Sequence, residues 1–414
     1  MILNTDVLIV GGGFAGLSCF RNIDRKRKRV TLLTNRDHFL FTPLLPHAAV
    51  GSVEVRSIIE SIHLFEKKPG EVITGEVFDI KPQEKKLLVK FSDEQIRELR
   101  YQTLVIATGA IPGTFDVPGV LDYCLFIKEA KDARKVREKI LTQFDKASAL
   151  DPSERKRALN FVIIGAGATG IETACEIHDL VKDDLLRFYP QLAADIQIQI
   201  IEAAHDILPA FDKTLARYAS LKLMQKGIVL RTGLSVKEVK DGAVILATGE
   251  IIQSETMIWA TGNAPNLFTK IFAERVGCNL EKGGRIPIDK NLKVRNGLHE
   301  IYAIGDCSAY KDEKDTLLPA TAQVAMKQGI YLGRYLSDKE KKPFNFKSMG
   351  MLVSLGSRSA IADLGTLHFK GALAWWFWRA AYLTRLVSLR NKVSVAFDWF
   401  KVKIFGRNIA RIDF

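Results

Sequence analysis

The chain has 414 residues, of which 47% are hydrophobic and 26% are charged. This length suggests two or three domains, and a mean hydropathy of +0.03 excludes both a disordered chain and a polytopic membrane protein. No apolar run reaches the roughly 18 residues that a membrane-spanning helix needs. The net charge of +13 favours an anionic partner, such as a phosphorylated cofactor, an anionic lipid or nucleic acid.

The cysteines exclude two classes of protein. They lie far apart, without a CxxC pair or a His/Cys cluster at zinc spacing, which argues against a dithiol reductase and against any metal site. Their odd number and scatter are typical of a reducing compartment. A strand-like segment starts within the first ten residues, so we expect no cleaved targeting peptide. The cysteines are Cys19, Cys124, Cys175, Cys278 and Cys307.

The first motif is a glycine loop between an apolar strand, residues 7–10, and a predicted helix. Such a loop lets the backbone approach a pyrophosphate, whose charge then lies at the helix N-terminus. The next predicted strand, residues 30–33, ends at Thr34, where units of this kind usually carry an acidic ribose ligand. Asn35 or Asp37 could replace that acid. The loop glycines are Gly11, Gly13 and Gly16.

The same pattern recurs after an apolar strand at residues 161–164. A later strand, residues 196–201, ends at Glu202, where a carboxylate can accept a hydrogen bond from a ribose 2′-hydroxyl. The same carboxylate repels a 2′-phosphate, so this unit should prefer NAD(H) to NADP(H). We attribute the long spacing before Glu202 to an extended helix and a loop around Tyr189 and Pro190. The loop glycines are Gly165, Gly167 and Gly170.

Three further strand ends follow in the expected order. Residues 104–109 and 257–262 are apolar strands that close on Ala-Thr-Gly, and residues 301–306 close on Gly-Asp. A carboxylate at the last position can accept a hydrogen bond from a polyol hydroxyl. Each feature alone is most simply a buried strand and turn, but all five in this order indicate two dinucleotide-binding units.

The C-terminal segment, residues 371–414, holds four of the five tryptophans and eight basic residues against two acidic ones. Its aromatic and apolar residues follow steps of three and four, which predicts one face of one or two helices. An aromatic face beside a basic one is typical of a helix at a membrane surface. The alternative is a helix packed on the domain or in a homodimer interface. The predicted stripe is Trp375, Trp378, Tyr382, Leu386, Leu389, Val393, Phe397, Phe400 and Ile404.

With these motifs, the chain resembles the type II NADH dehydrogenases, the single-chain NADH:quinone oxidoreductases among the two-dinucleotide-binding-domain flavoproteins. The segments that carry the match are residues 38–46, 165–172, 322–325 and 373–391. The resemblance implies an α/β fold with two tandem Rossmann-like dinucleotide-binding domains, for FAD and NADH, and a C-terminal amphipathic helical membrane-anchoring segment.

The resemblance also implies domain boundaries. The expected order is the first part of the FAD domain, a helical linker returning to it, the NADH domain, the second part of the FAD domain with a quinone-site helix, and the membrane-anchoring region. These parts span residues 1–115, 116–160, 161–275, 276–335 and 336–414.

Several residues acquire expected roles through the resemblance. The pyrophosphate of non-covalently bound FAD would lie at the first glycine loop, Gly11, Gly13 and Gly16, and NADH at the second, Gly165, Gly167 and Gly170. Glu202 would bind the NADH ribose, and Glu172 would lie near the nicotinamide and the flavin. The remaining expected FAD contacts are Thr108, Gly109, Asp306, Ala322 and Gln323.

The expected quinone-site helix departs from the family pattern at one position. Gln323 matches the family's glutamine, but the second glutamine, four residues on, is replaced by Lys327, with Gln328 next. In a helix, residues 323 and 327 share a face and residue 328 is rotated about 100° away. Lys327 could lie near the flavin or the quinone, or extend to solvent or lipid headgroups.

The resemblance therefore implies a non-proton-pumping NADH:quinone oxidoreductase, peripheral to the membrane on its cytoplasmic, NADH-containing face and without nucleic-acid partners. One alternative is a sulfide:quinone oxidoreductase-like flavoprotein, which needs two redox cysteines near the flavin, and nothing pairs Cys175 with Cys307. A second is a basic, NAD-responsive flavoprotein with a binding role. Binding of nucleic acid would need a stripe of basic and aromatic residues, and the sequence has none outside the tail, which argues against this second alternative.

Overall fold

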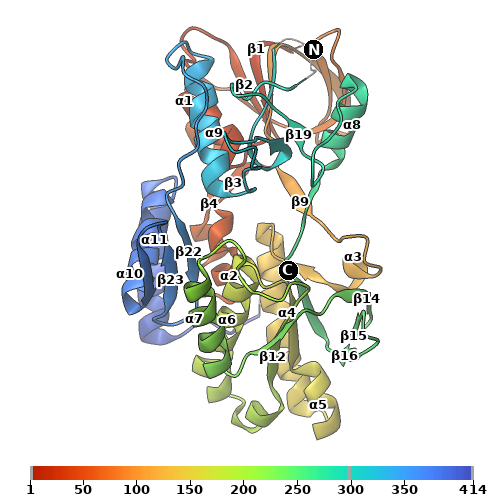
Figure 1. Cartoon of the computed structure of the whole chain (residues 1–414), viewed down its shortest axis with the longest axis vertical. Coiled ribbons are helices and arrows are strands. Elements are labelled where there is room, and N and C mark those ends of the chain that lie inside the picture. The colour runs from red at the N-terminus through yellow and green to blue at the C-terminus, as the bar shows by residue number, and fades with distance from the viewer. Residues whose placement is uncertain (1–2, 296–299, 412–414) are drawn as a thin grey trace. The chain divides into compact units, whose positions relative to one another are not determined.

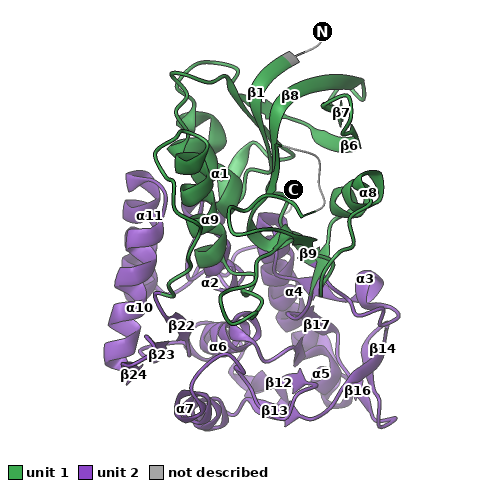
Figure 2. Cartoon of the chain, turned by 45° about the horizontal axis from the view of Figure 1, so that its top comes forward, with its two compact units in different colours: residues 1–40, 60–111, 263–348 green, residues 41–59, 112–262, 349–414 purple. Residues whose placement is uncertain are grey.

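The computed structural model describes residues 3–295 and 300–411, and these residues form two compact units. Unit 1 comprises residues 3–40, 60–111 and 263–348, and unit 2 comprises residues 41–59, 112–262 and 349–411 (Figure 2). No helix in the described part of the chain is long and apolar enough to cross a membrane.

Unit 1 is built on a mixed seven-stranded sheet (Figure 1). Its order is β5-β2-β1-β8-β7-β6, and β20 pairs with the second half of β8, beyond the end of β7. The pairs of β1 with β2 and β8, and of β8 with β20, are parallel, so the carboxyl ends of these strands meet at one edge. The strands are β1 (Leu3–Val10), β2 (Val30–Thr34), β5 (Val72–Thr74), β6 (Glu76–Lys81), β7 (Lys86–Lys90), β8 (Ile96–Ile106) and β20 (Ile301–Ala303).

Two helices of unit 1 pack at unusually close range. The helix α1 (Phe14–Asn22) lies against α9 (Ala322–Tyr335), and the contact is made through glycines of α9. A Cβ atom at Gly329 would lie 2.2 Å from the backbone oxygen of Ala15, and one at Gly333 would lie 2.7 Å from that of Cys19. Any larger residue would push α9 away, so these glycines fix its position beside the first glycine loop. The remaining helix of the unit is α8 (Leu267–Val276).

Unit 2 contains a second, all-parallel sheet of order β10-β17-β11-β12-β13. Every residue of β11 and β17 is buried, as expected for parallel strands that are covered on both faces. The strands are β10 (Leu125–Phe126), β11 (Asn160–Ile164), β12 (Gln197–Glu202), β13 (Val229–Thr232) and β17 (Thr256–Trp259). The helices are α2 (Leu45–Ala48), α3 (Val120–Tyr123), α4 (Ala130–Ala149), α5 (Pro152–Ala158), α6 (Ala168–Asp183) and α7 (Lys213–Gln225).

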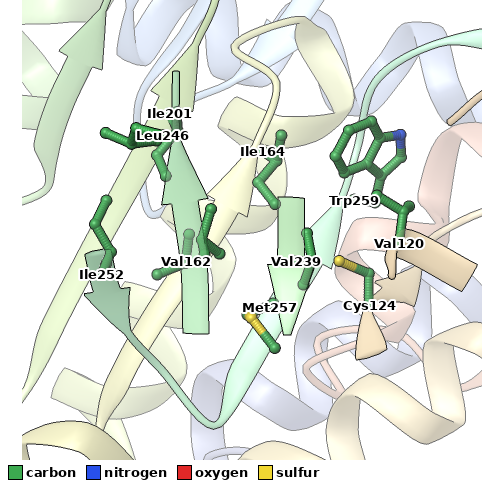
Figure 3. Close-up of a cluster of buried hydrophobic side chains, with 11 residues drawn as sticks. Val120, Cys124, Val162, Ile164, Ile201, Val239, Leu246, Ile252, Met257 and Trp259 are labelled. Atoms are coloured by element: carbon green, nitrogen blue, oxygen red, sulfur yellow. The ribbon is translucent and has the colours of Figure 1, made fainter. Parts of the chain in front are cut away.

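A small antiparallel sheet covers one face of this parallel sheet. Its strands are β14 (Val236–Lys240), β15 (Ala243–Leu246) and β16 (Ile251–Gln253). Figure 3 shows the core between the two sheets, where Val239 and Leu246 face Val162, Met257 and Trp259. The indole Nε1 of Trp259 donates to the backbone oxygen of Gly113 at 2.9 Å, so the polar atom in this apolar cluster is satisfied.

The C-terminal part of unit 2 is a three-stranded antiparallel sheet followed by two helices. The elements are β22 (Met351–Ser354), β23 (Ala360–Asp363), β24 (His368–Gly371), α10 (Ala372–Arg385) and α11 (Leu389–Phe405). The remaining short strands of the described chain are β3 (His38–Leu40), β4 (Ile59–Ser61), β9 (Ala110–Pro112), β18 (Asn263–Pro265), β19 (Ile286–Pro287) and β21 (Ser308–Ala309).

The units differ from the expected domain boundaries. We expected residues 116–160 to return to the FAD domain, but they belong to unit 2. Their helix α4 packs on the sheet of that unit, where the ring centres of Phe144 and Phe161 of β11 lie 6.2 Å apart. Residues 41–59 also join unit 2, whereas residues 263–275 join unit 1. In that unit Arg275 of α8 pairs with Asp79 of β6 at 2.8 Å. These long-range contacts leave no local pattern in the sequence.

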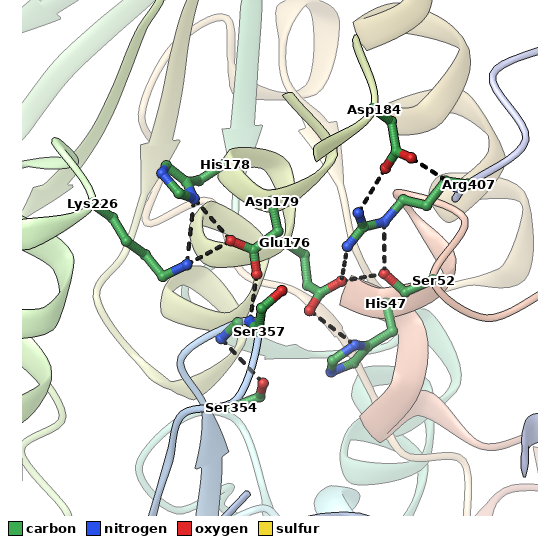
Figure 4. Close-up of polar contacts among 11 residues, drawn as sticks. His47, Ser52, Glu176, His178, Asp179, Asp184, Lys226, Ser354, Ser357 and Arg407 are labelled. Atoms are coloured by element: carbon green, nitrogen blue, oxygen red, sulfur yellow. Dashed lines mark hydrogen bonds and ion pairs between the residues drawn. The ribbon is translucent and has the colours of Figure 1, made fainter. Parts of the chain in front are cut away.

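A buried arginine holds the end of the chain in unit 2 (Figure 4). The side chain of Arg407 is 7% exposed, and its Nη1 lies 2.8 Å from Oδ2 of Asp184. Its Nε donates to Oγ of Ser52 at 3.0 Å, and its Nη2 lies 3.7 Å from Oε2 of Glu176. Arg407 therefore neutralises two buried carboxylates that lie on or directly after α6.

Replacing Arg407 by alanine should destabilise unit 2 by about 3–5 kcal/mol, because it leaves the buried Asp184 without its counter-ion and removes one of the two cationic partners of Glu176. All five tryptophans belong to unit 2, so urea unfolding followed by tryptophan fluorescence reports on this unit. The matched control is Arg411→Ala, which breaks an ion pair with Asp145. Each of these two side chains is 41% exposed. That change should cost no more than about 1 kcal/mol. Equal losses in the two variants would contradict the assigned role of Arg407.

Candidate functional site

The first glycine loop joins β1 to α1 in unit 1. Gly11 has φ of +113°, and a Cβ atom there would lie 2.2 Å from the backbone oxygen of Ala107. At Gly16 the same atom would lie 1.8 Å from the backbone oxygen of Gly11. Gly13, by contrast, faces open space, and it begins α1 without a side-chain cap or an acidic residue in the first turn. The uncapped amide groups of α1 are therefore suited to bind a phosphate.

The other expected FAD contacts lie at the ends of elements of the same unit. Thr108 and Gly109 follow β8, and Asp306 lies in the short turn after β20. The backbone oxygen of Thr108 accepts a hydrogen bond from Nδ2 of Asn266 at 2.9 Å, which orients the strand end. Since β1, β8 and β20 are parallel neighbours, these residues gather at one edge of the sheet. The arrangement fits a dinucleotide cofactor whose pyrophosphate lies at α1.

The second strand of this unit lacks an acid at its end, as the sequence indicated. Thr34 is buried, and its hydroxyl accepts a hydrogen bond from the backbone amide of Arg36 at 3.2 Å. Asn35 and Asp37, the two candidates to replace the acid, are exposed, and Asp37 contacts His38 at 2.6 Å. Their role in ribose binding stays a prediction.

The helix expected to carry Gln323 and Lys327 is α9, and its role at a quinone site stays a prediction. The hydroxyl of Thr321 caps it by accepting from the backbone amide of Val324 at 3.3 Å, so Ala322 and Gln323 lie in its first turn. Gln328 is buried, and its Oε1 accepts from the backbone amide of Gly305 at 2.7 Å, next to Asp306. Gln328 is thus a structural residue that supports the turn carrying Asp306.

Lys327 lies on a different face of α9 from Gln328, as the helical spacing predicted. Its Nζ donates to the backbone oxygen of Lys347 and lies 5.4 Å from the ring centre of Phe346. Both partners are uncharged, so they neutralise none of its positive charge. Lys327 therefore remains a candidate source of positive charge beside Gln323.

The second glycine loop joins β11 to α6 in unit 2 and repeats the geometry of the first. Gly165 has φ of +111°, and a Cβ atom at Gly170 would lie 1.9 Å from the backbone oxygen of Gly165. Gly167 faces open space and begins α6 without a side-chain cap. This helix N-terminus is thus also suited to bind a phosphate.

Glu202, at the end of β12, lies directly beside this loop. Its Oε2 accepts a hydrogen bond from the backbone amide of Ala166 at 2.7 Å, and its Oε1 accepts from that of Ala204 at 2.9 Å. The extra spacing before Glu202 is occupied by the 16-residue helix α6 and by two short 3-10 helices, Leu185–Arg187 and Pro190–Asp195, as predicted. The carboxylate is fixed at the position where an adenine ribose hydroxyl would be bound.

Glu172 lies on the buried face of α6, one turn after the loop. It is 4% exposed, and its Oε1 accepts a hydrogen bond from the backbone amide of Ser354 at 2.9 Å. Burial raises the pKa of Glu172 to about 7, although the charge of His47 and the hydrogen bond from Ser354 oppose the shift. A carboxyl group of this kind can exchange a proton at neutral pH.

Sequence reasoning missed a second buried carboxylate and a histidine beside Glu172. Glu176 lies one turn further along the same face of α6, and His47 follows directly after the segment 38–46 that carried the family resemblance. Their Oε1 and Nδ1 atoms lie 3.2 Å apart (Figure 4). The spacing of four between Glu172 and Glu176 was a signal in the sequence, but nothing local pointed to His47.

The predicted aromatic stripe of the tail does not form one face. Trp378, Tyr382 and Leu386 are buried in unit 2, whereas the five later members of the stripe, on α11, are exposed. The break between α10 and α11 at residues 386–388 changes the helical register. The spacing of apolar residues by three and four positions in the sequence does not reveal such a break. The exposed apolar residues of the tail are Leu373, Trp376, Phe377, Leu389, Val393, Phe397, Phe400, Ile404 and Phe405.

The described residues contain no group of His, Cys, Asp and Glu side chains that could hold a metal ion. All five cysteines are buried and free. Burial raises the pKa values of the Cys175 and Cys307 thiols, which disfavours the reactive thiolate.

Comparison with known proteins agrees with this geometry. Residues 5–329 match the model of the pyridine nucleotide-disulphide oxidoreductase family, and residues 349–408 match that of the NDH2 C-terminal domain. A probable NADH dehydrogenase of Dictyostelium discoideum is 37% identical, over 99% of this chain and 92% of the relative. External NADH-ubiquinone oxidoreductase 2 of Saccharomyces cerevisiae is 35% identical, over 97% of this chain and 82% of the relative.

The fold is also that of a solved structure. NDH2 of Plasmodium falciparum superimposes with a TM-score of 0.93, covering 99% of this chain and 100% of that chain at 24% identity. The predicted fold class and the family resemblance are confirmed. The chain therefore belongs to the pyridine nucleotide-disulphide oxidoreductase family and carries the C-terminal domain of the NDH2 proteins, the type II NADH dehydrogenases.

Proposed function

We propose that the protein is an NADH:quinone oxidoreductase that uses non-covalently bound FAD. The observation that carries this function is the pair of glycine loops, each opening a helix whose N-terminus has no side-chain cap, one in each unit. Two phosphate-binding helix N-termini, each following a strand with parallel neighbours, are what one flavin dinucleotide and one nicotinamide dinucleotide require. A relative at 35% identity carries the name external NADH-ubiquinone oxidoreductase 2.

Each unit would bind one of the two dinucleotides. In unit 1, Gly11, Gly13 and Gly16 would hold the FAD pyrophosphate, and Asp306 would accept a hydrogen bond from a ribitol hydroxyl. In unit 2, the loop of Gly165, Gly167 and Gly170 would hold the NADH pyrophosphate, and Glu202 would bind its ribose. FAD, when bound, would supply the redox chemistry between NADH and the quinone, so the side chains of the protein would act through orientation and charge. Ala322, with Thr108 and Gly109, would complete the FAD contacts.

We assign three side chains to the reacting groups. Glu172 would exchange a proton near the nicotinamide and the flavin, since its pKa is raised to about 7. Gln323 would donate a hydrogen bond to the quinone, and Lys327 would place a positive charge beside it. The purified protein tests the scheme directly: oxidised-flavin absorbance should be bleached by NADH and restored by a quinone.

The sulfide:quinone alternative is less supported. Such an enzyme needs two cysteines that react together at the flavin, and here Cys175 and Cys307 belong to different units and are both buried. Addition of sulfide should therefore leave the flavin spectrum unchanged.

We further propose that the tail attaches the protein to a membrane surface, on the cytoplasmic, NADH-containing face. On α11, Val393, Phe397, Phe400 and Ile404 follow steps of four, three and four and are 55–62% exposed, so they form one apolar stripe. The tail is also strongly basic, which favours an anionic lipid surface over a neutral protein partner. Its basic residues are Arg379, Arg385, Arg390, Lys392, Lys401, Lys403, Arg407 and Arg411.

Nucleotide choice tests the role of Glu202. We expect kcat/KM for NADH to exceed that for NADPH at least tenfold, or about 1.4 kcal/mol, because a carboxylate repels the 2′-phosphate. Glu202→Gln keeps the size of the side chain and removes its charge. It should reduce the ratio of kcat/KM for NADH to that for NADPH severalfold. The control is Glu238→Gln, a surface residue of β14 in the same unit, which should leave the ratio as in the wild type. Equal kcat/KM values for the two nucleotides in the wild type would refute the assignment.

Membrane binding tests the exposed stripe of α11. Truncation at Gly371 is unsuitable, since it would also remove the buried Trp378 and Arg407. Changing Val393, Phe397 and Phe400 together to serine should weaken sedimentation with anionic phospholipid vesicles at least tenfold, because each inserted side chain contributes roughly 1.5–3 kcal/mol. High salt should weaken the wild type without releasing it fully.

The control for this experiment is a triple serine variant of Phe188, Leu221 and Met224, which are exposed apolar residues of the same unit. It should sediment with the vesicles as the wild type does. Wild-type binding by the α11 variant would refute the membrane anchor and leave the homodimer interface as the occupant of this stripe, which sedimentation velocity would reveal.

Lys327→Gln tests the departure from the family pattern. The change removes a positive charge and should shift the quinone KM or turnover severalfold and lower the flavin reduction potential, while flavin reduction by NADH changes little. Lys290→Gln, at an exposed lysine of the same unit, is the control. An unchanged potential together with unchanged quinone kinetics would show that Lys327 lies outside the site.

A further inference from the structure

His47 is a buried histidine whose two ring nitrogens have different surroundings. It lies in α2, its side chain is 5% exposed, and its Nδ1 lies 3.2 Å from Oε1 of Glu176, which is itself 6% exposed. Its Nε2 is buried as well, and it has no hydrogen-bond partner within the described part of the chain. A buried polar atom without a partner costs free energy, so Nε2 is a candidate ligand-binding atom.

The contact with Glu176 determines which nitrogen titrates. Because the carboxylate accepts a hydrogen bond from Nδ1–H, the Nδ1 proton is held in both charge states of the ring. The proton that is gained and lost is therefore the one on Nε2. In the protonated ring Nε2–H is a donor, and in the neutral ring Nε2 is an acceptor.

Glu176 is itself kept ionised by its surroundings. Burial favours its neutral form, but His47 and Arg407 outweigh this effect and lower the pKa of Glu176 below its ordinary value. Ser52 also donates a hydrogen bond to Oε2 (Figure 4). A carboxylate that stays charged in a buried site is a strong and permanent partner for an imidazolium.

The same surroundings favour the protonated form of His47. Burial by itself lowers the pKa of His47, but the charge and hydrogen bond of Glu176 and the charge of Glu172 raise it above the ordinary value, while Arg379 opposes them. Other ionisable groups also face α2 or its partners. They are Arg407 of the C-terminal segment with its partner Asp184, Asp179 of α6, whose charge acts on Glu176, Tyr382 of α10, and Arg137 of α4, which lies against Gly51 and 3.9 Å from Glu54.

The rings of Trp378 and Tyr382 from α10 and of Phe41 form a buried apolar surface beside this histidine. The ring of Trp378 lies 4.8 Å from that of His47, and Tyr382 stacks on Trp378 at 4.4 Å with an interplanar angle of 28°. Phe41 meets Tyr382 edge to face at 6.1 Å. A flat apolar ligand with a polar oxygen at its edge, such as a quinone, combines the two features that this surface and Nε2 would recognise.

We propose that Nε2–H of His47 donates the hydrogen bond, and then the proton, to a carbonyl oxygen of the quinone. The inference deepens the proposed function and rests on it, because it assigns the source of one proton in the second half of the reaction. The residue was not among those predicted from the sequence.

The proton and electron balance requires one such donor. NADH and a quinone give NAD⁺ and a quinol, and the hydride of NADH carries two electrons and one proton, so one more proton must be supplied. In the proposed step the N–H bond at Nε2 breaks and an O–H bond forms on the quinol. The imidazole is left neutral, still donating through Nδ1–H to Glu176, and it regains its proton from solvent water.

Three variants of the holoenzyme test this assignment. His47→Gln keeps a polar side chain but cannot deliver a proton, and Glu176→Gln keeps His47 but removes the charge that holds its proton. The matched control is His178→Gln, on the same helix as Glu176, where Nδ1 lies 2.8 Å from Oδ1 of Asp179. His178 forms a second pair of a histidine with a carboxylate; its side chain is 15% exposed, and among the described residues no aromatic ring packs against it as Trp378 does against His47.

The first readout is kinetic. With saturating ubiquinone-1, His47→Gln should lower the rate of quinone reduction at least tenfold, far more than it lowers flavin bleaching by NADH. Glu176→Gln should shift the fall of this rate with rising pH to lower pH, since loss of the carboxylate lowers the pKa of His47. His178→Gln should retain the wild-type rate and pH profile. Thermal melting of each holoenzyme identifies a variant that has not folded.

The second readout does not depend on turnover or on any variant's activity. In holoenzyme labelled with ¹⁵N-histidine, the Nε2 resonance of His47 is the one missing from the spectrum of His47→Gln, and it should shift on addition of ubiquinone-1. No shift, or quinone reduction by His47→Gln within twofold of the wild type and with the same pH profile, would overturn the proposal alone. Wild-type holoenzyme that NADH reduces but quinone does not reoxidise would overturn the proposed function with it.

Discussion

The organisation of unit 2 depends on the buried carboxylate of Glu176. It accepts hydrogen bonds from Ser52 and His47 of the segment 41–59, and it is neutralised by Arg407 of the C-terminal segment. Two stretches that are distant in the sequence are thereby tied to one turn of α6. A charge in a buried site is stable only if such partners remain in place, so this carboxylate constrains the packing of all three segments.

The two glycine loops show how one local geometry serves two different ligands. In both, a glycine with positive φ approaches a neighbouring strand end, and another allows its helix to pack on the loop. The difference lies at the end of the next strand, where unit 1 has the buried Thr34 and unit 2 has Glu202 bonded to the amide of Ala166. On the proposed function, the choice of ligand would depend on a residue one strand away from the phosphate-binding loop of each unit.

The sequence allowed prediction of those features whose causes are local. Gly11, Gly165 and Glu202 belong to short strand-loop-helix patterns, so their positions followed from the spacing alone. The pairing of His47 with Glu176 and Arg407 could not be predicted, because it joins residues about 130 and 230 positions apart without a periodic signal. The burial of the stripe could also not be predicted, since the break at residues 386–388 changes the helical register between α10, where its later members are buried, and α11, where its members are exposed. The same holds for residues 116–160, whose helix α4 is assigned to unit 2 by its packing.

On the two proposals above, the helix α10 would link the membrane surface to the proton donor of unit 2. Its exposed side carries Leu373, Trp376 and Phe377, whereas its buried side places Trp378 and Tyr382 beside His47. A surface helix usually has one apolar and one polar side, whereas α10 is apolar on both. This is expected for a helix whose one side packs on protein and whose other side would contact lipid. A quinone that leaves the bilayer along α10 would remain in contact with aromatic rings until it reached a proton donor. Anchoring the protein and guiding its acceptor are then two consequences of the same helix.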